Sequence, residues 1–381
     1  MSDKDKNMLA IHCTSDQLSG LENNALKIME WLNDAGANLT YFGPAGFSAV
    51  KVAKEKNIPT VPLPVYVEQS TFKRAHILSR YLKKGEYKVL MLLKPRDLAA
   101  AAIIKKIFYR SIKLVYYQHI EHNKQMKPWI FSLIFRSFDS IFELRNYLLE
   151  QTLTIPRINS NKLHIIPTGI DSEKITKKLI TKEQARKALS LPAKKRIVGI
   201  VGKHSHKRKH HFLIRAIQFL RRNNYDVDLL IMGDSHKKHE KEYYAFLKEL
   251  THECNVEKYV HFRPCDEDLS NFFCSIDAFV HNISGSPYDT ICLQAMISGT
   301  PVIAVSSDNN KELLEEGKYG LLYKANDLED FAAKTIRLIT QPKIEEHLIN
   351  EGKKVVQTTY DKPVIVSKII DLTNKLIHSE S

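Results

Sequence analysis

A polar loop that leads into a short helix and then into an apolar strand carries the strongest chemical signal in the sequence. It runs from Ser286 to Ala304 and reads SPYDTICLQAMISGTPVIA. The first N–H groups of a helix have no partners within the helix and lie at its positive dipole end. We therefore expect the amides near Asp289 and Thr290 to form a pocket for a diphosphate. A plain connection between two strands would have the same pattern, so the segment alone does not identify the ligand.

A second candidate for phosphate binding is a basic cluster between an apolar strand and a helix. It reads GKHSHKRKHH and extends from Gly202 to His211. Glycine at the end of a strand lets the backbone approach a ligand closely. Lys203 and Arg208 can then reach phosphate oxygens from one side. The alternative is a solvated basic loop, and the position at the carboxyl end of a strand favours phosphate.

The elements that must position these groups alternate in both halves of the chain. Short apolar runs and longer helical patterns follow one another, which predicts α/β domains with doubly wound parallel sheets. The runs are MLAIHCTS, NLTYFG, KVLMLLK and KLVYYQH in the first half, and RIVGIVG, VDLLIMG, VHFRP, IDAFVHN and PVIAV in the second. Such sheets bind ligands outside the carboxyl ends of their strands. We expect two facing domains with one substrate on each wall of a cleft, a geometry that suits group transfer.

The length of 381 residues is too great for one ordinary core and suits two domains. We predict an N-terminal domain over residues 1–170 and a C-terminal domain over 196–345. Residues 171–195, rich in lysine, are predicted to be a linker with a short helix. Residues 346–381 are predicted to form helices that pack back on the N-terminal domain, with Pro363 interrupting or starting a helix.

The composition excludes several classes of protein. Hydrophobic residues make up 43% and charged residues 26% of the chain, as in an ordinary globular protein. The five cysteines are widely spaced and form no CxxC pair, which argues against a disulfide framework or a thiolate zinc site. No apolar run approaches the roughly 20 residues of a membrane-spanning helix, and the first residues lack the apolar core of a secretory signal. We therefore expect a cytoplasmic protein.

The formal charge of +14 predicts anionic partners such as nucleotide diphosphates, phosphorylated glycans or anionic lipids. Basic residues alternate with large apolar ones, among them Phe108, Trp129, Phe131 and Phe135, in the segment from 105 to 145. This pattern suits an anionic membrane face or a lipid-linked, phosphorylated acceptor. The alternative is a set of buried aromatic side chains with a solvated basic rim. No recognition helix or aromatic RNA-binding motif accompanies the charge, so we expect no nucleic-acid partner.

Several segments together resemble family 4 of the glycosyltransferases, a retaining, nucleotide-sugar-dependent class with the GT-B fold. KLHIIPTGID, residues 162–171, is similar to the family's KI-x-VIPNGID segment between the domains. RIVGIVGKHSHKRKH resembles its strand followed by GR-x5-K, and VDLLIMGD its strand ending in GDG or GDS. LQAMISGTPVIA is nearly the family's LEAMA-SGTPVIA. The similarity covers nearly the whole chain and is densest from 163 to 338.

The resemblance implies a donor site formed mainly by the C-terminal domain. Lys203 and Arg208 stand where the family has arginine and lysine. Ser19-Gly20-Leu21-Glu22 resembles the family's GGxE, whose backbone amides face the donor phosphate. YVHFRPC resembles the family's strand whose following backbone contacts the nucleobase. The donor-binding residues implied in this way are Gly20, Gly202, Lys203, Arg208, Gly233, Arg263, Ser286, Asp289, Thr290 and Gln294.

The resemblance also implies a catalytic histidine. His119, at the end of KLVYYQH, falls where the family has a histidine beside the transferred sugar, and His122 competes because the alignment can slip within QHIEHN. The family's two glutamates, eight positions apart, correspond here to Ser286 and Gln294. The amide of Gln294 can still bond ribose hydroxyls, whereas the side chain of Ser286 is too short to replace a glutamate.

These features imply transfer of a sugar from a nucleotide-diphosphate sugar to a glycan, glycolipid or phosphorylated acceptor in the synthesis of a bacterial cell-envelope polysaccharide or lipopolysaccharide. Cations and helix amides would stabilise the departing diphosphate, so no metal or other cofactor is expected. Two DxD-like triplets, at 226–228 and 266–268, lie in positions that do not suit a metal motif. The missing glutamates leave two alternatives: a weak or inactive module that binds a nucleotide or glycan, and a nucleotide-sugar epimerase, which shares the fold.

Overall fold

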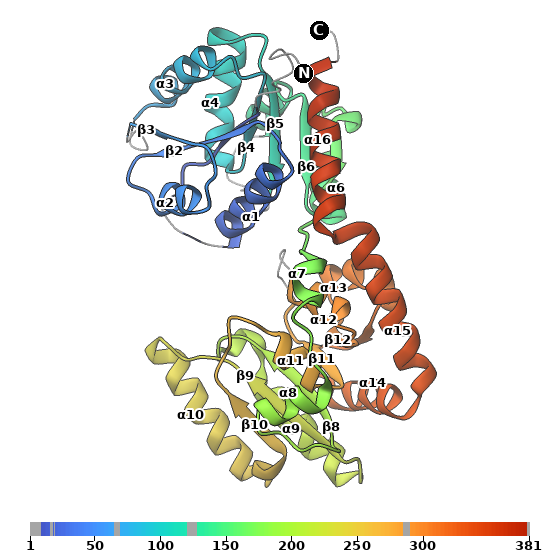
Figure 1. The fold of residues 1–381 in the computed structure, drawn as a ribbon. Helices are drawn as coiled ribbons and strands as arrows, with labels where there is room; N and C mark the ends of the chain where they lie inside the picture. Colours follow the sequence, from blue (N-terminus) through green and yellow to red (C-terminus); the bar gives the residue numbers. More distant parts are fainter. Residues whose placement is uncertain are drawn as a thin grey trace. The chain divides into compact units, whose positions relative to one another are not determined.

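The computed structural model describes residues 9–15, 18, 20–64, 69–119, 128–284 and 290–378. The chain divides into two compact units (Figure 1). The first consists of Met1–Thr168 together with Lys362–Ser381, and the second of Gly169–Asp361. Each unit contains a sheet in which every described strand pair is parallel, with helices between successive strands. The predicted fold class, α/β with two doubly wound parallel sheets, is confirmed.

The first sheet has seven strands in the order β3-β2-β1-β4-β5-β6-β7. The chain order reverses between β1 and β4, where Leu9 pairs with both Leu39 and Val89. A doubly wound sheet binds its ligand at such a reversal. The strands are β1 (Leu9–His12), β2 (Leu39–Pro44), β3 (Thr60–Leu63), β4 (Val89–Leu92), β5 (Lys113–Gln118), β6 (Ser140–Glu143) and β7 (Leu163–Ile165).

The helices of the first unit pack on both faces of this sheet. Residues of α3, α4 and α5 share one core cluster with the strands, and α16 contacts α1 and β4. None of the helices in the described ranges has the length and apolar character needed to cross a bilayer. The helices are α1 (Gly20–Asp34), α2 (Ser48–Glu55), α3 (Thr71–Lys84), η1 (Pro95–Asp97), α4 (Leu98–Ile103), the π-helical turn η2 (Ile104–Phe108), α5 (Pro128–Phe135), α6 (Asn146–Leu153), η3 (Ser160–Lys162) and α16 (Lys362–His378).

The second sheet has six strands in the order β10-β9-β8-β11-β12-β13, with the reversal between β8 and β11. The strands are β8 (Arg196–Val201), β9 (Val227–Met232), β10 (Val260–Arg263), β11 (Ala278–His281), β12 (Val302–Val305) and β13 (Leu321–Tyr323). Its helices are α7 (Ser172–Thr176), α8 (Lys182–Ala188), η4 (His206–Arg208), α9 (His210–Arg222), α10 (Lys238–Glu253), η5 (Glu257–Tyr259), α11 (Ser270–Ser275), α12 (Thr290–Ile297), α13 (Asp308–Leu313), η6 (Glu315–Gly317), α14 (Leu328–Thr340), α15 (Pro342–Val355) and η7 (Val356–Tyr360).

Two of the predicted boundaries need correction. Residues 171–195, predicted as a linker, belong to the second unit, because Arg186 of α8 forms a buried ion pair of 2.8 Å with Asp277 and donates to the carbonyl of Ser275. Residues 346–381 do not pack as one block on the first unit. Helix α15 contacts α12 and α14 in the second unit, where Leu348 is buried, and only α16 belongs to the first.

Candidate active site

The carboxyl edge of the first sheet holds His119, which directly follows β5. Its Nδ1 lies 2.9 Å from the carbonyl oxygen of Tyr117, and its Nε2 lies 3.2 Å from Nδ2 of Asn24 in α1. A carbonyl oxygen can only accept, so Nδ1 carries the proton and Nε2 accepts from the amide of Asn24. His119 is 0% exposed. A sugar hydroxyl can therefore reach Nε2 only if Asn24 moves away from it.

Burial also determines the charge of this histidine. Desolvation lowers the pKa of His119 to about 4. The imidazole is therefore neutral near pH 7, and its accepting nitrogen can orient a hydroxyl group but does not bring a positive charge to the site. His122, the competing candidate, lies outside the described residues.

The beginning of α1 brings a further pair of charges to the same edge. Gly20 is the exposed first residue of α1, as expected for an amide donor at a helix start. Two residues later, the buried carboxylate of Glu22 lies 2.6 Å from Nζ of Lys94, which follows β4. The Glu22–Lys94 pair thus joins the start of α1 to the end of β4. Because Gly20 and His119 occupy this same edge, the structure places both predicted N-terminal site residues together.

A polar group that the sequence analysis missed follows β1 and β4. The buried carboxylate of Asp97 accepts hydrogen bonds from the hydroxyl of Thr14, at 2.7 Å, and from its backbone N–H, at 3.3 Å. The same hydroxyl accepts from Nε of Arg96, at 2.6 Å, and Arg74 lies 3.6 Å from Asp97. One sequence feature could have identified this group: Thr14 and Arg96 each lie just after a strand, at the reversal of the sheet.

The carboxyl edge of the second sheet is shaped by two glycines. Gly202 has φ +124°, and a Cβ there would lie 2.4 Å from Cζ of Arg208. A Cβ on Gly233 would lie 2.3 Å from the carbonyl oxygen of Gly202. Glycine at position 202 lets Arg208 fold back over the end of β8, where its Nη1 donates to the carbonyl of Val201 at 3.0 Å. Glycine at position 233 lets the end of β9 approach the backbone of Gly202.

The cations of this edge differ in exposure. Lys203 is exposed, whereas Arg208 is half-buried and desolvation lowers the pKa of its guanidinium. An arginine stays protonated in proteins, so Arg208 presents a fixed positive charge beside the strand ends. His204, which the sequence analysis did not select, is buried at this edge and has its Nδ1 2.8 Å from Oγ of Ser235. The structure thus brings Gly202, Arg208 and Gly233 together.

The side chain of Arg263 is bonded to backbone carbonyls within the second unit. Its Nε donates to the carbonyl of Leu189 at 2.6 Å, and its Nη2 donates to the carbonyl of Ser190 at 2.9 Å. Its Nη1 donates to the carbonyl of Phe262 at 2.8 Å. The guanidinium thus closes the carboxyl end of α8. If this position contacts a donor, the contact is therefore made by the backbone after β10 and not by the side chain.

The predicted diphosphate pocket lies partly outside the described residues, which do not include Ser286 and Asp289. Thr290 is the first residue of α12, and Gln294 follows one turn later. Both side chains are half-buried. The helix start and the ribose-binding amide predicted from the sequence therefore belong to one helix of the second unit.

The carboxylates of the DxD-like triplets have structural partners. Asp226 pairs with Lys195 and Arg221, and Asp228 lies 2.9 Å from His261. Asp268 accepts from the backbone N–H of Ser270, at 3.0 Å, at the beginning of α11. Across the described ranges, no three His, Cys, Asp or Glu side chains gather in a way that could hold a metal ion.

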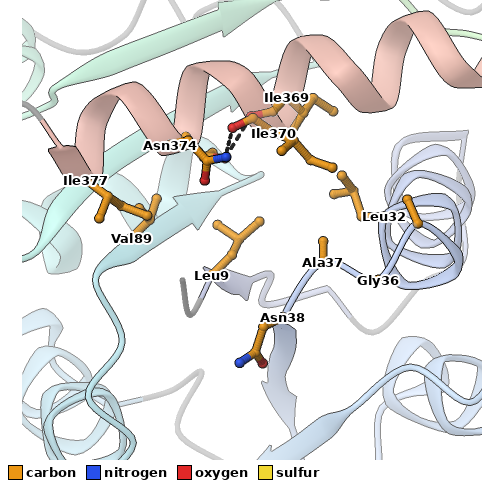
Figure 2. A pocket seen from close by; sticks show the side chains of 12 residues that line it. Leu9, Leu32, Gly36, Ala37, Asn38, Val89, Ile369, Ile370, Asn374 and Ile377 are labelled. Atoms are coloured by element: carbon orange, nitrogen blue, oxygen red, sulfur yellow. Dashed lines mark hydrogen bonds between the residues drawn. The ribbon is translucent and has the colours of Figure 1, made fainter. Parts of the chain in front are cut away.

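A cavity of about 480 Å³ lies in the first unit, at the opposite end of the strands (Figure 2). Leu9 and Val89, the first residues of β1 and β4, line it together with Leu32 of α1 and Ile369 and Ile377 of α16. These side chains surround the cavity with apolar groups. It lies at the amino ends of the strands, so it is separate from the charged carboxyl edge that holds His119.

Comparison with known proteins places this architecture among glycosyltransferases. Residues 181–355 match the family model described as glycosyl transferases group 1. The lipopolysaccharide core biosynthesis glycosyltransferase LpsE of Rhizobium meliloti (strain 1021) is 24% identical over 187 residues. These residues are 49% of this chain and 52% of LpsE, so the match spans about half the length of that relative.

Two solved structures resemble the whole chain. A glycosyltransferase from Rickettsia africae ESF-5 superposes with a TM-score of 0.85 at 14% identity, over 99% of this chain and 100% of that one. Anabaena Alr3699/HepE in complex with UDP and glucose gives a TM-score of 0.73 at 17% identity, over 97% and 99% of the two chains. The common feature is the pair of Rossmann-like domains of the GT-B fold. The similarity to the glycosyl transferases group 1 lies in residues 181–355, all of which belong to the second unit.

Proposed function

We propose that this protein is a retaining, metal-independent glycosyltransferase that transfers a sugar from a nucleotide-diphosphate sugar to a glycan or glycolipid acceptor. One observation carries the proposal. Within the segment matched by the family, Gly202 lets the guanidinium of Arg208 lie over the end of β8 at the carboxyl edge of the sheet. A fixed guanidinium at that edge suits the phosphates of a nucleotide-sugar.

The chemical task of this wall is to stabilise the leaving group. During transfer, the bond between the anomeric carbon and the phosphate oxygen breaks, and a bond from the acceptor oxygen to that carbon forms. Negative charge grows on the departing nucleotide diphosphate. Arg208, Lys203 and the N–H groups at the start of α12 would supply positive potential there, in a part of the site where water is displaced. The acceptor's proton would pass to the departing phosphate on the same face of the sugar.

His119 is the residue that we propose orients the donor sugar. Its Nε2 is a hydrogen-bond acceptor, as judged from the contact of Nδ1 with the carbonyl of Tyr117. Its lowered pKa keeps it neutral. A sugar hydroxyl would take the place of Asn24 on Nε2 after rotation of that amide. His119 would then act by positioning the sugar and not as a strong base.

The acceptor is proposed to belong to a bacterial cell-envelope polysaccharide or lipopolysaccharide, with transfer at the cytoplasmic side of the plasma membrane. LpsE is named for lipopolysaccharide core biosynthesis, and HepE was solved with UDP and glucose. Those descriptions apply to LpsE and HepE themselves. For this chain they support a search among UDP-sugars first and envelope glycans as acceptors.

The test begins with the donor. Thermal unfolding of the purified chain is measured with UDP-, GDP-, ADP- and CMP-sugars, and the best ligand is then used in hydrolysis and transfer assays in excess chelator. We expect one nucleotide class to raise the unfolding temperature, and we expect turnover to persist in chelator. NMR of the product should show the anomeric configuration of the donor. Loss of all turnover in chelator would contradict metal independence, and an inverted product would contradict retention.

A second candidate function is a module that binds a nucleotide-sugar without transferring it. It is favoured by Gln294, which stands where the resemblance implies a glutamate. The same assays separate the two functions. Stabilisation by a nucleotide-sugar without hydrolysis or transfer to any envelope glycan would support the binding module.

A further inference from the structure

Four large apolar side chains are exposed on neighbouring helices of the first unit. Phe72 on α3 is 53% exposed and Ile107 on η2 is 58% exposed. Trp129 and Leu133 on α5 are 63% and 49% exposed. The three helical segments belong to one layer, because α3 contacts α4 and η2, and α4 contacts α5. We call the outer side of this layer, with these four residues, the α3–α5 surface.

Helix α5 has apolar residues on both of its sides. Phe131 and Phe135 are buried in the core cluster of the first sheet. Trp129 and Leu133 are four residues apart and therefore lie on a common face, which points outward. The helix contains no charged residue. A helix that is hydrophobic all round is normally buried all round. The outer face of α5 is therefore suited to an apolar or interfacial environment.

The structure divides the large apolar residues of the 105–145 segment between the core and the surface. Phe131 and Phe135 are core residues, as a set of buried aromatic side chains requires. Trp129 and Ile107 are not core residues. The structure also adds α3, which lies outside the segment selected from the sequence. There Phe72 contacts the ring of Phe108 at a centroid distance of 5.2 Å and still remains half exposed.

The charges around these apolar residues are almost all positive. Residues 71–84 contain five Lys or Arg residues and no Asp or Glu. In α3, Phe72 and Lys83 are eleven residues apart and lie on the same helical face. Lys83 is exposed on this face, Lys84 is exposed on an adjacent face at the end of α3, and Lys106 and Arg136 are exposed beside Ile107 and Leu133.

The acidic groups near this surface are few. Asp139 is already paired with Lys105 and accepts from the backbone N–H of Leu114. Asp97 is buried within the carboxyl edge. Over residues 71–118 and 128–138, Glu86 is the one acidic side chain that is exposed. The α3–α5 surface therefore presents an excess of positive charge around its apolar groups.

We propose that the α3–α5 surface binds the anionic face of a lipid bilayer. Trp129, Leu133, Ile107 and Phe72 enter the boundary between headgroups and acyl chains, and the surrounding lysines and arginines contact the headgroup phosphates. Their long aliphatic stems allow the charges to remain in the headgroup layer while the apolar groups are buried. The proposal adds a partner to the proposed function, on which its biological purpose rests. The binding itself is measurable without any sugar transfer.

Flotation of the full chain with vesicles tests the proposal. Vesicles of phosphatidylcholine alone are compared with an equal mixture of phosphatidylcholine and phosphatidylglycerol. We expect flotation with the anionic vesicles, little with the neutral ones, and a decrease as salt is raised, because salt screens the charges. The absence of flotation with the anionic vesicles at low salt would overturn the proposal.

Variants locate the binding to the surface. Trp129→Gln combined with Leu133→Gln, and Lys83→Glu combined with Lys84→Glu, should each lower vesicle binding about tenfold or more. Phe246→Gln is the matched control, because Phe246 is 41% exposed on α10 of the second unit. It should float like the unchanged protein. Circular dichroism verifies that each variant is folded. Undiminished flotation of both double variants would show that another surface binds and would also overturn the proposal.

The thermal-shift assay with nucleotide-sugars, performed without vesicles, distinguishes the two proposals. If the double variants lose vesicle binding but keep the donor-induced shift, the surface and the donor site act separately, as expected. If the unchanged protein binds vesicles but no nucleotide-sugar stabilises it, the proposed function fails and the membrane surface remains. Binding to neutral and anionic vesicles alike would contradict the electrostatic part of the proposal.

Discussion

The carboxyl edges of the two sheets are built in different ways. In the first unit, the edge is made of polar side chains bonded to one another, such as His119 to Asn24 and Glu22 to Lys94. In the second unit, glycines follow two strands, and Arg208 folds against the first of them, Gly202. The same doubly wound topology thus forms its carboxyl edge from interlocked side chains in one unit, and from glycine backbone with a folded-back arginine in the other.

The two edges also differ in whether their cations are paired with carboxylates. The first edge compensates its cations with the buried carboxylates of Glu22 and Asp97. In the second, Asp234 and Glu240 lie at the same edge, but within the described residues neither Lys203 nor Arg208 forms an ion pair with them. Cations that form no ion pair are suited to an anionic ligand, whereas paired ones are suited to holding neutral hydroxyl groups. This difference supports the proposal that the diphosphate binds at the edge of the second unit.

Removal of the cation at the second edge should have the largest effect. Arg208→Gln should lower the turnover number by about 10²–10³-fold, because one preorganised donor of charge to the leaving group is lost. Steady-state kinetics with a saturating donor measures it. Arg222→Gln, an exposed arginine in the last turn of α9, is the control and should keep full activity. An unchanged turnover number for Arg208→Gln would remove the diphosphate from this edge.

A methyl group on the first glycine should have the next largest effect. Gly202→Ala places a Cβ 2.4 Å from Arg208 and strains a backbone with φ +124°. We expect about a tenfold to hundredfold loss of transfer, with a loss of unfolding free energy of about 1–3 kcal/mol. Gly36→Ala separates the two causes, since Gly36 also has a positive φ, of +78°, but a Cβ there meets no atom within 4 Å. That control should destabilise the protein without reducing transfer per folded molecule.

Substitutions at the first edge should lower activity less than those at the second edge, and they should affect turnover more than stability. His119→Ala should lower turnover by about tenfold, within the range for a group that positions a reactant, without unfolding the protein. His252→Ala, on an exposed turn of α10, is the control. Transfer by His119→Ala at the unchanged rate would reject a role for His119 and turn attention to His122.

The same histidine has a separate effect on stability. Burial lowers the pKa of His119 from 6.5 to about 4, so the folded state favours the neutral form. The unfolded state binds more protons between these two values, and stability should fall as the pH is lowered through that window. Unfolding curves of the unchanged protein and of His119→Gln between pH 7 and pH 4 should therefore converge at the acidic end.

The smallest effect on activity should come from Arg263. Its guanidinium donates to the carbonyls at the end of α8, so Arg263→Ala should lower the free energy of unfolding by about 1–2 kcal/mol. Donor affinity should change by less than about threefold, since the backbone remains. Calorimetry with the donor nucleotide measures both quantities. A large loss of donor affinity with normal stability would instead show that the side chain of Arg263 contacts the donor.

Much of the fold could be predicted because it depends on local patterns. Apolar runs between helical segments predicted both sheets, and RIVGIVG followed by GKHSHKRKHH predicted β8 and the basic edge after it. The membership of residues 171–195 could not be predicted in this way. It depends on the pairing of Arg186 with Asp277, which are far apart in the chain. Likewise, nothing local separates the buried Phe131 from the exposed Trp129.

By itself, the sequence determined the periodicity of strands and helices, the glycines at the strand ends and the excess of positive charge. These are properties of neighbouring residues, so they can be read along the chain. Only the tertiary structure decided that Asn24 bonds to His119, that Arg263 donates to the carbonyls at the end of α8, and that one side of α5 remains outside the core. Each of these depends on which distant segments the packing brings together, because desolvation and hydrogen bonding act between neighbours in space.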